Sequence, residues 1–82
     1  MARMEYCRLA LKKAGTFRND LVILYSDPDR PEGVREELVQ RKVSFIKINS
    51  LLKDVTDRLV ADGWEEISVK ETEVHFKRLC SE

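Results

Sequence analysis

The amino-acid sequence predicts one small α+β domain over residues 1–82, in which helices pack on a mixed sheet of about four strands. Three observations predict this class. A strand-length apolar run lies at residues 21–25, a helical apolar stripe ends at Gly63, and two alternating segments follow at 64–70 and 73–79. Because 82 residues are too few for two independent cores, we expect a single domain.

The first segment, residues 3–14, carries two conflicting periodicities. Met4, Cys7 and Leu11 follow helical spacing, whereas Cys7, Leu9 and Leu11 alternate as in a strand. Alanine, leucine, lysine and arginine are good helix formers, so the composition favours an N-terminal helix. An additional strand is the alternative.

The middle of the chain predicts a strand, a helix and a second strand. The apolar run at residues 21–25 lies between polar residues, which is typical of a buried central strand. Pro31 suits the first turn of a helix that continues to about residue 41. Residues 43–48 then supply the next apolar strand.

A second helix is expected between a cap at Asn49 or Ser50 and a stop at Gly63. Its apolar residues form one stripe at helical spacing. Gly63 is predicted to adopt the left-handed conformation just after the helix, which turns Trp64 back onto Leu59.

The last two segments, residues 64–70 and 73–79, predict a hairpin whose terminal strand is expected at an edge of the sheet. After the N-terminal segment, the expected order is therefore β-α-β-α-β-β. The apolar side of each element predicts one shared core: Leu21, Ile23, Phe45, Ile48, Val55, Leu59, Ile67 and Phe76.

Charge argues against nucleic acid as a partner. Lysine plus arginine number 15 and aspartate plus glutamate number 15, so no net positive field attracts phosphates. A basic segment nevertheless occupies the N-terminal part of the chain: Arg3, Arg8, Lys12, Lys13 and Arg18. A solvated strand or helix face explains such a segment more often than a binding surface does.

Localisation and redox chemistry follow from two absences. No apolar run reaches the roughly 18 residues that span a bilayer, and the N-terminus lacks the apolar region of a secretory signal. We therefore expect a cytoplasmic protein without a membrane partner. Cys7 and Cys80 are then expected as reduced thiols, and with His75 they supply too few ligands for a zinc site. No metal and no cofactor are predicted.

Two stretches resemble known families. Residues 59–69 read LVADGWEEISV, and VHFKR follows at 74–78. This C-terminal third resembles a family of short prokaryotic proteins of unknown function, whose signature is a helix ending L-x-x-x-G-W-E and a hairpin finishing near F-K-R. The resemblance implies a fold rather than an activity.

Residues 21–48 resemble the opening of a glutaredoxin, in which an apolar strand leads into a helix and a second strand. The resemblance implies a truncated thioredoxin-like fold. Arg30 and Gly33 occupy the places where that family carries its paired cysteines, so dithiol exchange is not implied.

The candidate ligand site is the loop carrying Asp27, Asp29, Arg30 and Glu32, just past the predicted core strand and at the expected helix start. Two carboxylates two residues apart suit a hard cation such as magnesium, and Arg30 suits an anionic group. The favoured interpretation is structural: the acids complement the helix dipole and start the turn, in an exposed, metal-free loop.

No catalytic residue is assigned, because His75 has no identifiable nucleophile and orienting acid around it. The leading hypothesis is a non-enzymatic protein-interaction or regulatory module that self-associates through a sheet edge or an apolar patch. One alternative is a small enzyme or ligand-binding domain that uses Asp27, Asp29 and Arg30 with a metal ion or phosphate. Another is weak nucleic-acid binding through the basic N-terminal segment.

Overall fold

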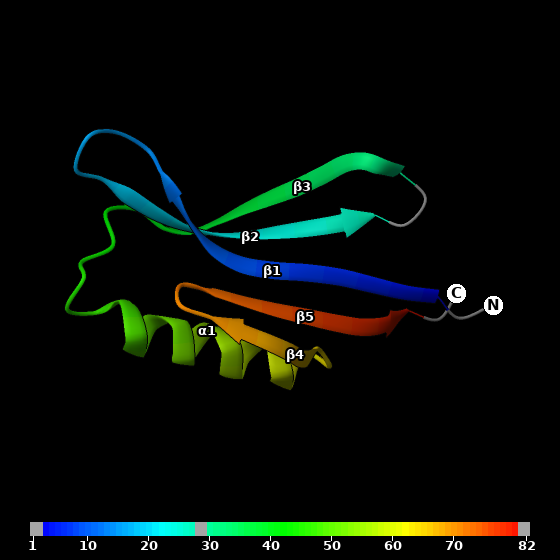
Figure 1. Ribbon diagram of the computed structural model, residues 1–82. Helices are drawn as coiled ribbons and strands as arrows, with labels where there is room; N and C mark the ends of the chain where they lie inside the picture. Colours follow the sequence, from blue (N-terminus) through cyan, green and yellow to red (C-terminus); the bar gives the residue numbers. More distant parts are fainter. Residues whose placement is uncertain (1–2, 28–29, 81–82) are drawn as a thin grey trace.

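A five-stranded antiparallel sheet with one helix forms the protein (Figure 1). The computed structural model describes residues 3–27 and 30–80, and the side chains of residues 27–34 and 80 are outside this description. The elements are β1 (Arg3–Lys13), β2 (Asn19–Asp27), β3 (Arg30–Gln40), α1 (Ile48–Ala61), β4 (Glu65–Lys70) and β5 (Glu73–Cys80). The strand order in the sheet is β3-β2-β1-β5-β4, and every neighbouring pair is antiparallel.

The predicted α+β class, with a mixed and thioredoxin-like sheet, is therefore wrong, since the fold is mostly β. The expected N-terminal helix is instead β1, the central strand, which pairs with β2 on one side and β5 on the other. Cys7 and Leu9 are buried, as their alternation indicates. Pairing along both edges outweighs the helix propensity of the Ala, Leu, Lys and Arg residues in this segment.

The helix expected from Pro31 is also wrong, because residues 30–40 form β3 and pair antiparallel with β2. The register shifts between Leu21 and Val22 and again between Ser26 and Asp27. A buried strand such as β2 needs hydrogen-bond partners on both sides, and the segment that follows it directly supplies them.

Residues 43–48 do not form the expected strand. β3 ends at Gln40, and Lys42 then adopts a left-handed φ of 54°. The Val43 N–H bonds to the Asn19 carbonyl at 2.9 Å. The next residues turn, with the Lys47 N–H donating to the Ser44 carbonyl at 3.1 Å, and α1 begins at Ile48. The chain therefore enters the helix without adding another strand to the sheet.

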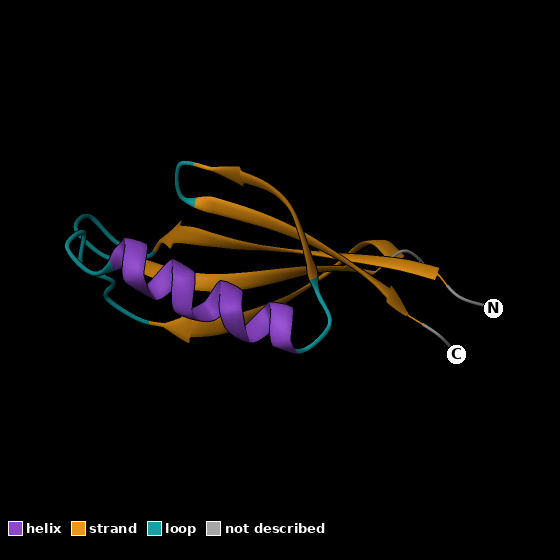
Figure 2. Cartoon of the chain, turned by 90° about the horizontal axis from the view of Figure 1, so that it is seen from below, coloured by secondary structure: helices purple, strands orange, loops and turns teal. Residues whose placement is uncertain are grey.

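The core lies between α1 and one face of the sheet, and the other face has no helix over it (Figure 2). The helix contributes Ile48, Leu52, Val55 and Leu59. Most of the predicted core is confirmed, with these residues buried: Leu21, Ile23, Ile48, Val55, Leu59 and Phe76. The prediction is wrong for Phe45, which is 81% exposed, and for Ile67, which is 46% exposed beside a register shift in β4.

The predicted end of the helix is confirmed. Gly63 has a φ of 97°, the Gly63 N–H bonds to the Val60 carbonyl, and the Trp64 N–H bonds to the Leu59 carbonyl, both at 3.0 Å. This is the Schellman hydrogen-bond pattern, and Trp64 is buried. The predicted helix start is displaced: Lys47 occupies the N-cap position, and the Ser50 hydroxyl donates to the Lys47 carbonyl at 3.1 Å.

The predicted C-terminal hairpin is confirmed as β4 and β5, but its terminal strand is not an edge. β5 lies between β1 and β4, so the edges of the sheet are β3 and β4. β4 is short, charged and irregular between Glu66 and Ser68, which are features that discourage pairing at an edge. Within the described residues, no helix is both long enough and apolar enough to cross a membrane.

Candidate functional site

The ligand site predicted from the sequence loses the helix on which it depended. Asp27 and Arg30 lie opposite each other at the end of the β2–β3 pair, and their side chains are not described. Asp29 lies outside the described residues. Because the chain continues from Arg30 as a strand, no helix N-terminus stands beside these residues to attract an anion.

His75 lies on the uncovered face of the sheet, beside the Arg8–Glu73 ion pair. Its Nε2 is 3.3 Å from Glu73 Oε1, and the same oxygen is 3.6 Å from Arg8 Nη1. Nε2 is buried but makes no hydrogen bond to the carboxylate. Ser26 on β2 and His75 on β5 line one small hollow, but β1 lies between these two strands. These residues therefore lack the contact between nucleophile and base that acyl transfer requires.

Acidic partners largely neutralise the basic N-terminal segment. Lys12 Nζ contacts both carboxylate oxygens of Glu36, at 3.0 and 3.2 Å, and Arg8 faces Glu73. Arg18 binds Asp20 through Nε and Nη2. The charges of Arg8, Lys12 and Arg18 are therefore partly offset within the molecule.

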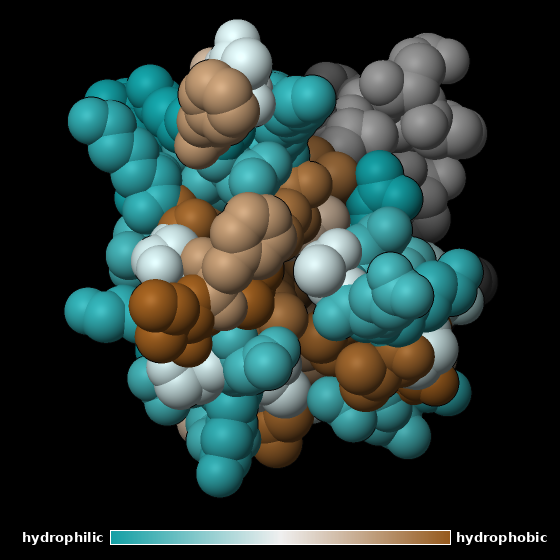
Figure 3. Space-filling model, turned by 60° about the vertical axis from the view of Figure 1, so that its left-hand side comes forward, coloured by the Kyte–Doolittle hydropathy of each residue, from teal (hydrophilic) through white to brown (hydrophobic). Residues whose placement is uncertain are grey.

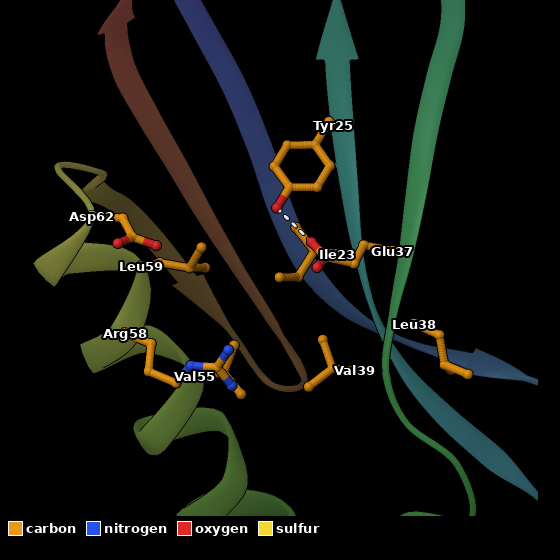
Figure 4. Close-up of a pocket in the computed structure, with 9 residues that line it drawn as sticks. All are labelled: Ile23, Tyr25, Glu37, Leu38, Val39, Val55, Arg58, Leu59 and Asp62. Carbon is orange, nitrogen blue, oxygen red and sulfur yellow. Dashed lines mark hydrogen bonds between the residues drawn. The ribbon is translucent and has the colours of Figure 1, made fainter.

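A groove of about 270 Å³ lies between α1 and the β2–β3 side of the sheet (Figure 4). Its floor is apolar, with Ile23, Val55 and Leu59 buried, and Arg58 and Asp62 line it from the helix. From the sheet, the Tyr25 hydroxyl donates to Glu37 Oε2 at 2.8 Å. Serine, cysteine and histidine are absent from the described residues that line the groove.

Tyr25 and Cys7 are titratable groups held in their neutral forms at this side of the core. Burial, reinforced by the hydrogen bond to Glu37, raises the pKa of Tyr25 to about 12. Burial likewise raises the pKa of the Cys7 thiol to about 12, although Arg78 acts in the opposite direction. A thiol that stays protonated at neutral pH is not a nucleophile, so Cys7 is a packing residue.

Trp64 is committed to packing rather than to stacking on a ligand. The guanidinium carbon of Arg78 lies 4.2 Å from the centre of its ring, and the Tyr25 ring lies 6.1 Å away. Arg78 also donates to Glu5 at 2.7 and 3.0 Å and to the Asp62 carbonyl at the end of the helix at 3.4 Å. These contacts tie β1, β5 and the end of α1 together.

The most unusual surface is at the end where the β1–β2 hairpin turns and the chain enters α1. Phe17 is 99% exposed, Phe45 81% and Ile46 93%. These side chains line one hollow of about 620 Å³, and Figure 3 shows apolar side chains gathered on this side of the molecule. We call Phe17, Phe45 and Ile46 the apolar end. An exposed apolar cluster of this kind marks interaction surfaces in soluble proteins.

A buried carboxylate fixes the two loops that carry the apolar end. Asp20 is 8% exposed and receives Arg18 Nε and Nη2 at 3.1 and 3.2 Å. It also accepts the Lys42 N–H at 3.2 Å. The hydrogen bond from Arg18 lowers the pKa of Asp20, which keeps the carboxylate charged although burial opposes this. Asp20 thus holds the hairpin that presents Phe17 beside the connection that presents Phe45 and Ile46.

The two loops are basic, although the chain as a whole is neutral. Residues 13–19 and 41–47 contain no acidic residue and five basic ones: Lys13, Arg18, Arg41, Lys42 and Lys47. Among these five, Arg18 binds Asp20 through its side chain, and the charge of Arg41 also stabilises that carboxylate. The apolar end therefore has a rim of positive charge.

Sequence reasoning missed this surface for an identifiable reason. Phe45 and Ile46 read as part of an apolar strand, and Phe17 lay between two expected elements. Their position among Lys13, Lys42 and Lys47 was the available signal, since buried strands are seldom bordered so closely by lysine.

Among the described residues, no group of three or more His, Cys, Asp or Glu side chains could hold a metal ion. Comparison of the chain with models of protein families, with curated proteins and with solved structures finds no match.

Proposed function

We propose that this protein is a non-enzymatic interaction module whose apolar end binds an acidic, apolar-anchored segment of a partner protein. The observation that carries this proposal is the exposure of Phe17, Phe45 and Ile46 on one surface. Fully burying one such side chain is worth about 1.5–3 kcal/mol, so a partner that covers all of them gains substantial free energy.

Rigidity supports this role. The Asp20 hydrogen bonds hold both loops in place before a partner arrives. Less conformational entropy is then lost on binding than if flexible loops had to become ordered. Aromatic anchors on a fixed backbone are typical of the residues that dominate binding energy.

Charge defines the chemistry of the partner. Lys42 lines the same hollow as the apolar side chains, and Lys13, Arg41 and Lys47 lie in the two loops that carry them. A partner segment with leucine or phenylalanine flanked by aspartate or glutamate would match both the apolar side chains and their basic rim. Electrostatic complementarity of this kind speeds association and selects against basic partners.

The test is a fluorescence-anisotropy titration with a short amphipathic peptide that carries leucine and phenylalanine on one face and glutamate on the other. We expect saturable binding that weakens as salt rises, because exposed charges are screened. The Phe17→Ser/Phe45→Ser double variant should bind at least about tenfold more weakly. Leu79→Ser is the matched control, since Leu79 is 62% exposed on β5, outside the two loops, and its loss should leave affinity unchanged.

Two controls identify the ligand class. The same peptide with lysine in place of glutamate should not bind, and phosphatidylserine vesicles should not sediment the protein. Equal affinity of the double variant and the parent, or no binding by the parent, would overturn the proposal. Binding to vesicles but not to the acidic peptide would also overturn it, and would assign the apolar end to a membrane surface instead.

A further inference from the structure

The edge strand β3 carries two opposite charges that make no ion pair within the described residues. Arg35 and Glu37 lie opposite Tyr25 and Ile23, so both point to the helix side of the sheet. The guanidinium carbon of Arg35 is 4.3 Å from the centre of the Tyr25 ring, and Glu37 accepts the Tyr25 hydroxyl. Both residues are exposed.

The outer side of β3 has no strand beside it, because β3 is the first strand of the sheet and pairs only with β2. Its 11 residues make it nearly twice as long as the six-residue β4 at the other edge. β3 is charged like β4 and its register with β2 shifts near both ends, but residues 34–38 pair with β2 without a shift. The outer side of this regular stretch is a template for another strand, and a second copy of the same edge can supply that strand through a twofold axis.

We propose that two copies of this chain associate by antiparallel pairing of β3 with β3, with the twofold axis passing through Glu36. In this register Arg35 of each copy lies opposite Glu37 of the other, so two ion pairs form across the junction. Opposite-charge pairs directly across antiparallel strands are stabilising. The sheets join into one continuous sheet, and both α1 helices lie on the same face.

Charge selects this register over its neighbours. An axis through Arg35 would place the two Arg35 side chains opposite each other, and an axis through Glu37 would do the same for the two glutamates. Like charges directly opposite are destabilising. An axis that passes between two residues is also excluded. Each residue would then lie opposite a residue whose side chain points to the other face of the sheet.

The two Glu36 side chains meet on the axis, but each already has a cation beside it. The Glu36 carboxylate is on the uncovered face, where Lys12 Nζ of β1 binds both oxygens at 3.0 and 3.2 Å. Lys12 reaches it across β2. This salt bridge directs the Glu36 carboxylate toward Lys12 and offsets part of its charge, which reduces the repulsion between the two copies.

The inference goes beyond the proposed function, because the apolar end takes no part in the junction. Phe45 and Ile46 follow the carboxyl end of β3 (Figure 1). An antiparallel pair of β3 strands therefore places the two apolar ends at opposite extremes of the dimer. The dimer would be a bivalent module, and two linked partner segments would gain avidity from it.

Sedimentation velocity over a range of concentrations tests the dimer. The parent should move from 9.6 kDa toward twice that mass as concentration rises. Arg35→Glu and Glu37→Arg each place like charges across the junction, so each should raise the dimer dissociation constant at least about tenfold. Mixing the two variants restores both ion pairs, so the mixture should form a heterodimer of near-parental affinity.

Four variants test the location and the register of the junction. Glu66→Arg on the opposite edge strand should leave dimerisation unchanged, and Phe17→Ser/Phe45→Ser should also leave it unchanged. Under mild oxidation, Glu36→Cys should cross-link to itself across the axis, whereas Gln40→Cys should not, since its symmetry mate is far along the strand.

Three results would overturn this inference. The parent could remain monomeric at every concentration, the charge variants could dimerise as the parent does, or dimerisation could disappear with the apolar end. Circular dichroism of each variant establishes that it is folded. The sedimentation results do not depend on peptide binding at the apolar end, so either proposal can fail without the other.

Discussion

Replacing Gly63 by alanine tests how the helix is joined to the hairpin. Gly63 has a φ of 97°, which an L-residue adopts at a cost of about 1–2 kcal/mol. An added Cβ would lie 3.7 Å from Arg78 Cδ, which is ordinary van der Waals contact. No clash adds to the backbone strain, so Gly63→Ala should lower the free energy of unfolding by about 1–2 kcal/mol.

The assay is urea unfolding followed by circular dichroism, with Gly15→Ala as the matched control. The φ of Gly15 lies outside the left-handed region, and its added Cβ would be 3.9 Å from Arg18 Cβ. Gly15→Ala should therefore be neutral or stabilise the protein by about 0.4–1 kcal/mol, because it restricts the unfolded chain. Gly63→Asn should cost less than Gly63→Ala, since asparagine tolerates this conformation better. Equal effects of alanine at both glycines would refute the strain argument.

Four further predictions follow from the packing and the ionisable groups. Trp64→Ala should lower the free energy of unfolding by about 3–5 kcal/mol in the same assay, because Trp64 is 5% exposed. A loss below about 1 kcal/mol would show that Trp64 is not part of the core. Phe17→Ser/Phe45→Ser should change the free energy of unfolding by no more than about 0.5 kcal/mol per residue, since both side chains are exposed. A large loss would mean that these side chains pack against the rest of the protein in solution. The Cys7 pKa is raised from 9.0 to about 12, so stability should begin to fall near pH 9, with a slope that approaches about 1.4 kcal/mol per pH unit. Cys7→Ala should reduce this slope most clearly between pH 9 and 10, because Tyr25, whose ordinary pKa is 10.0, contributes less there. The Asp20 pKa is lowered, so the stability that its carboxylate contributes should be complete above pH 4 and should disappear as pH falls through the folded pKa. Asp20→Asn should remove this acid dependence and speed amide exchange at Lys42, and an unchanged acid profile would contradict the anchor.

The C-terminal half of the fold could be predicted because local signals there agree with the tertiary structure. The apolar stripe of α1, the left-handed Gly63 and the buried Trp64 all depend on contacts within a few residues. The hairpin of β4 and β5 was predicted for the same reason. Consistency between local preference and global packing makes such segments readable.

The N-terminal half was predicted only in part: the strand at residues 21–25 is confirmed as β2, whereas pairing between distant segments decided its neighbours. Residues 3–13 have the composition of a helix, and only pairing with both β2 and β5 makes them a strand. The alternation of Cys7, Leu9 and Leu11 was the correct signal, and helix propensity was the misleading one. Residues 30–40 were misread in a similar way, since Pro31 suggested a helix start where a strand follows β2.

The candidate site was missed because apolar residues were assumed to be buried. Phe45 was assigned to the core from its apolar neighbours, yet the turn after Lys42 leaves it exposed. The Asp20 anchor joins residues 22 positions apart, which no local pattern reveals. Asp27, Asp29 and Arg30 were chosen by their place after a strand, and the argument depended on a helix that does not form.

The most direct test of the proposed function is a map of backbone amide shifts in the parent protein during titration with the acidic amphipathic peptide. The account predicts that saturable shifts concentrate in residues 14–20 and 42–48, around Phe17, Phe45 and Ile46. Shifts that concentrate instead in the groove beside Tyr25 and Arg58, or on the uncovered face beside Arg8 and His75, would contradict it.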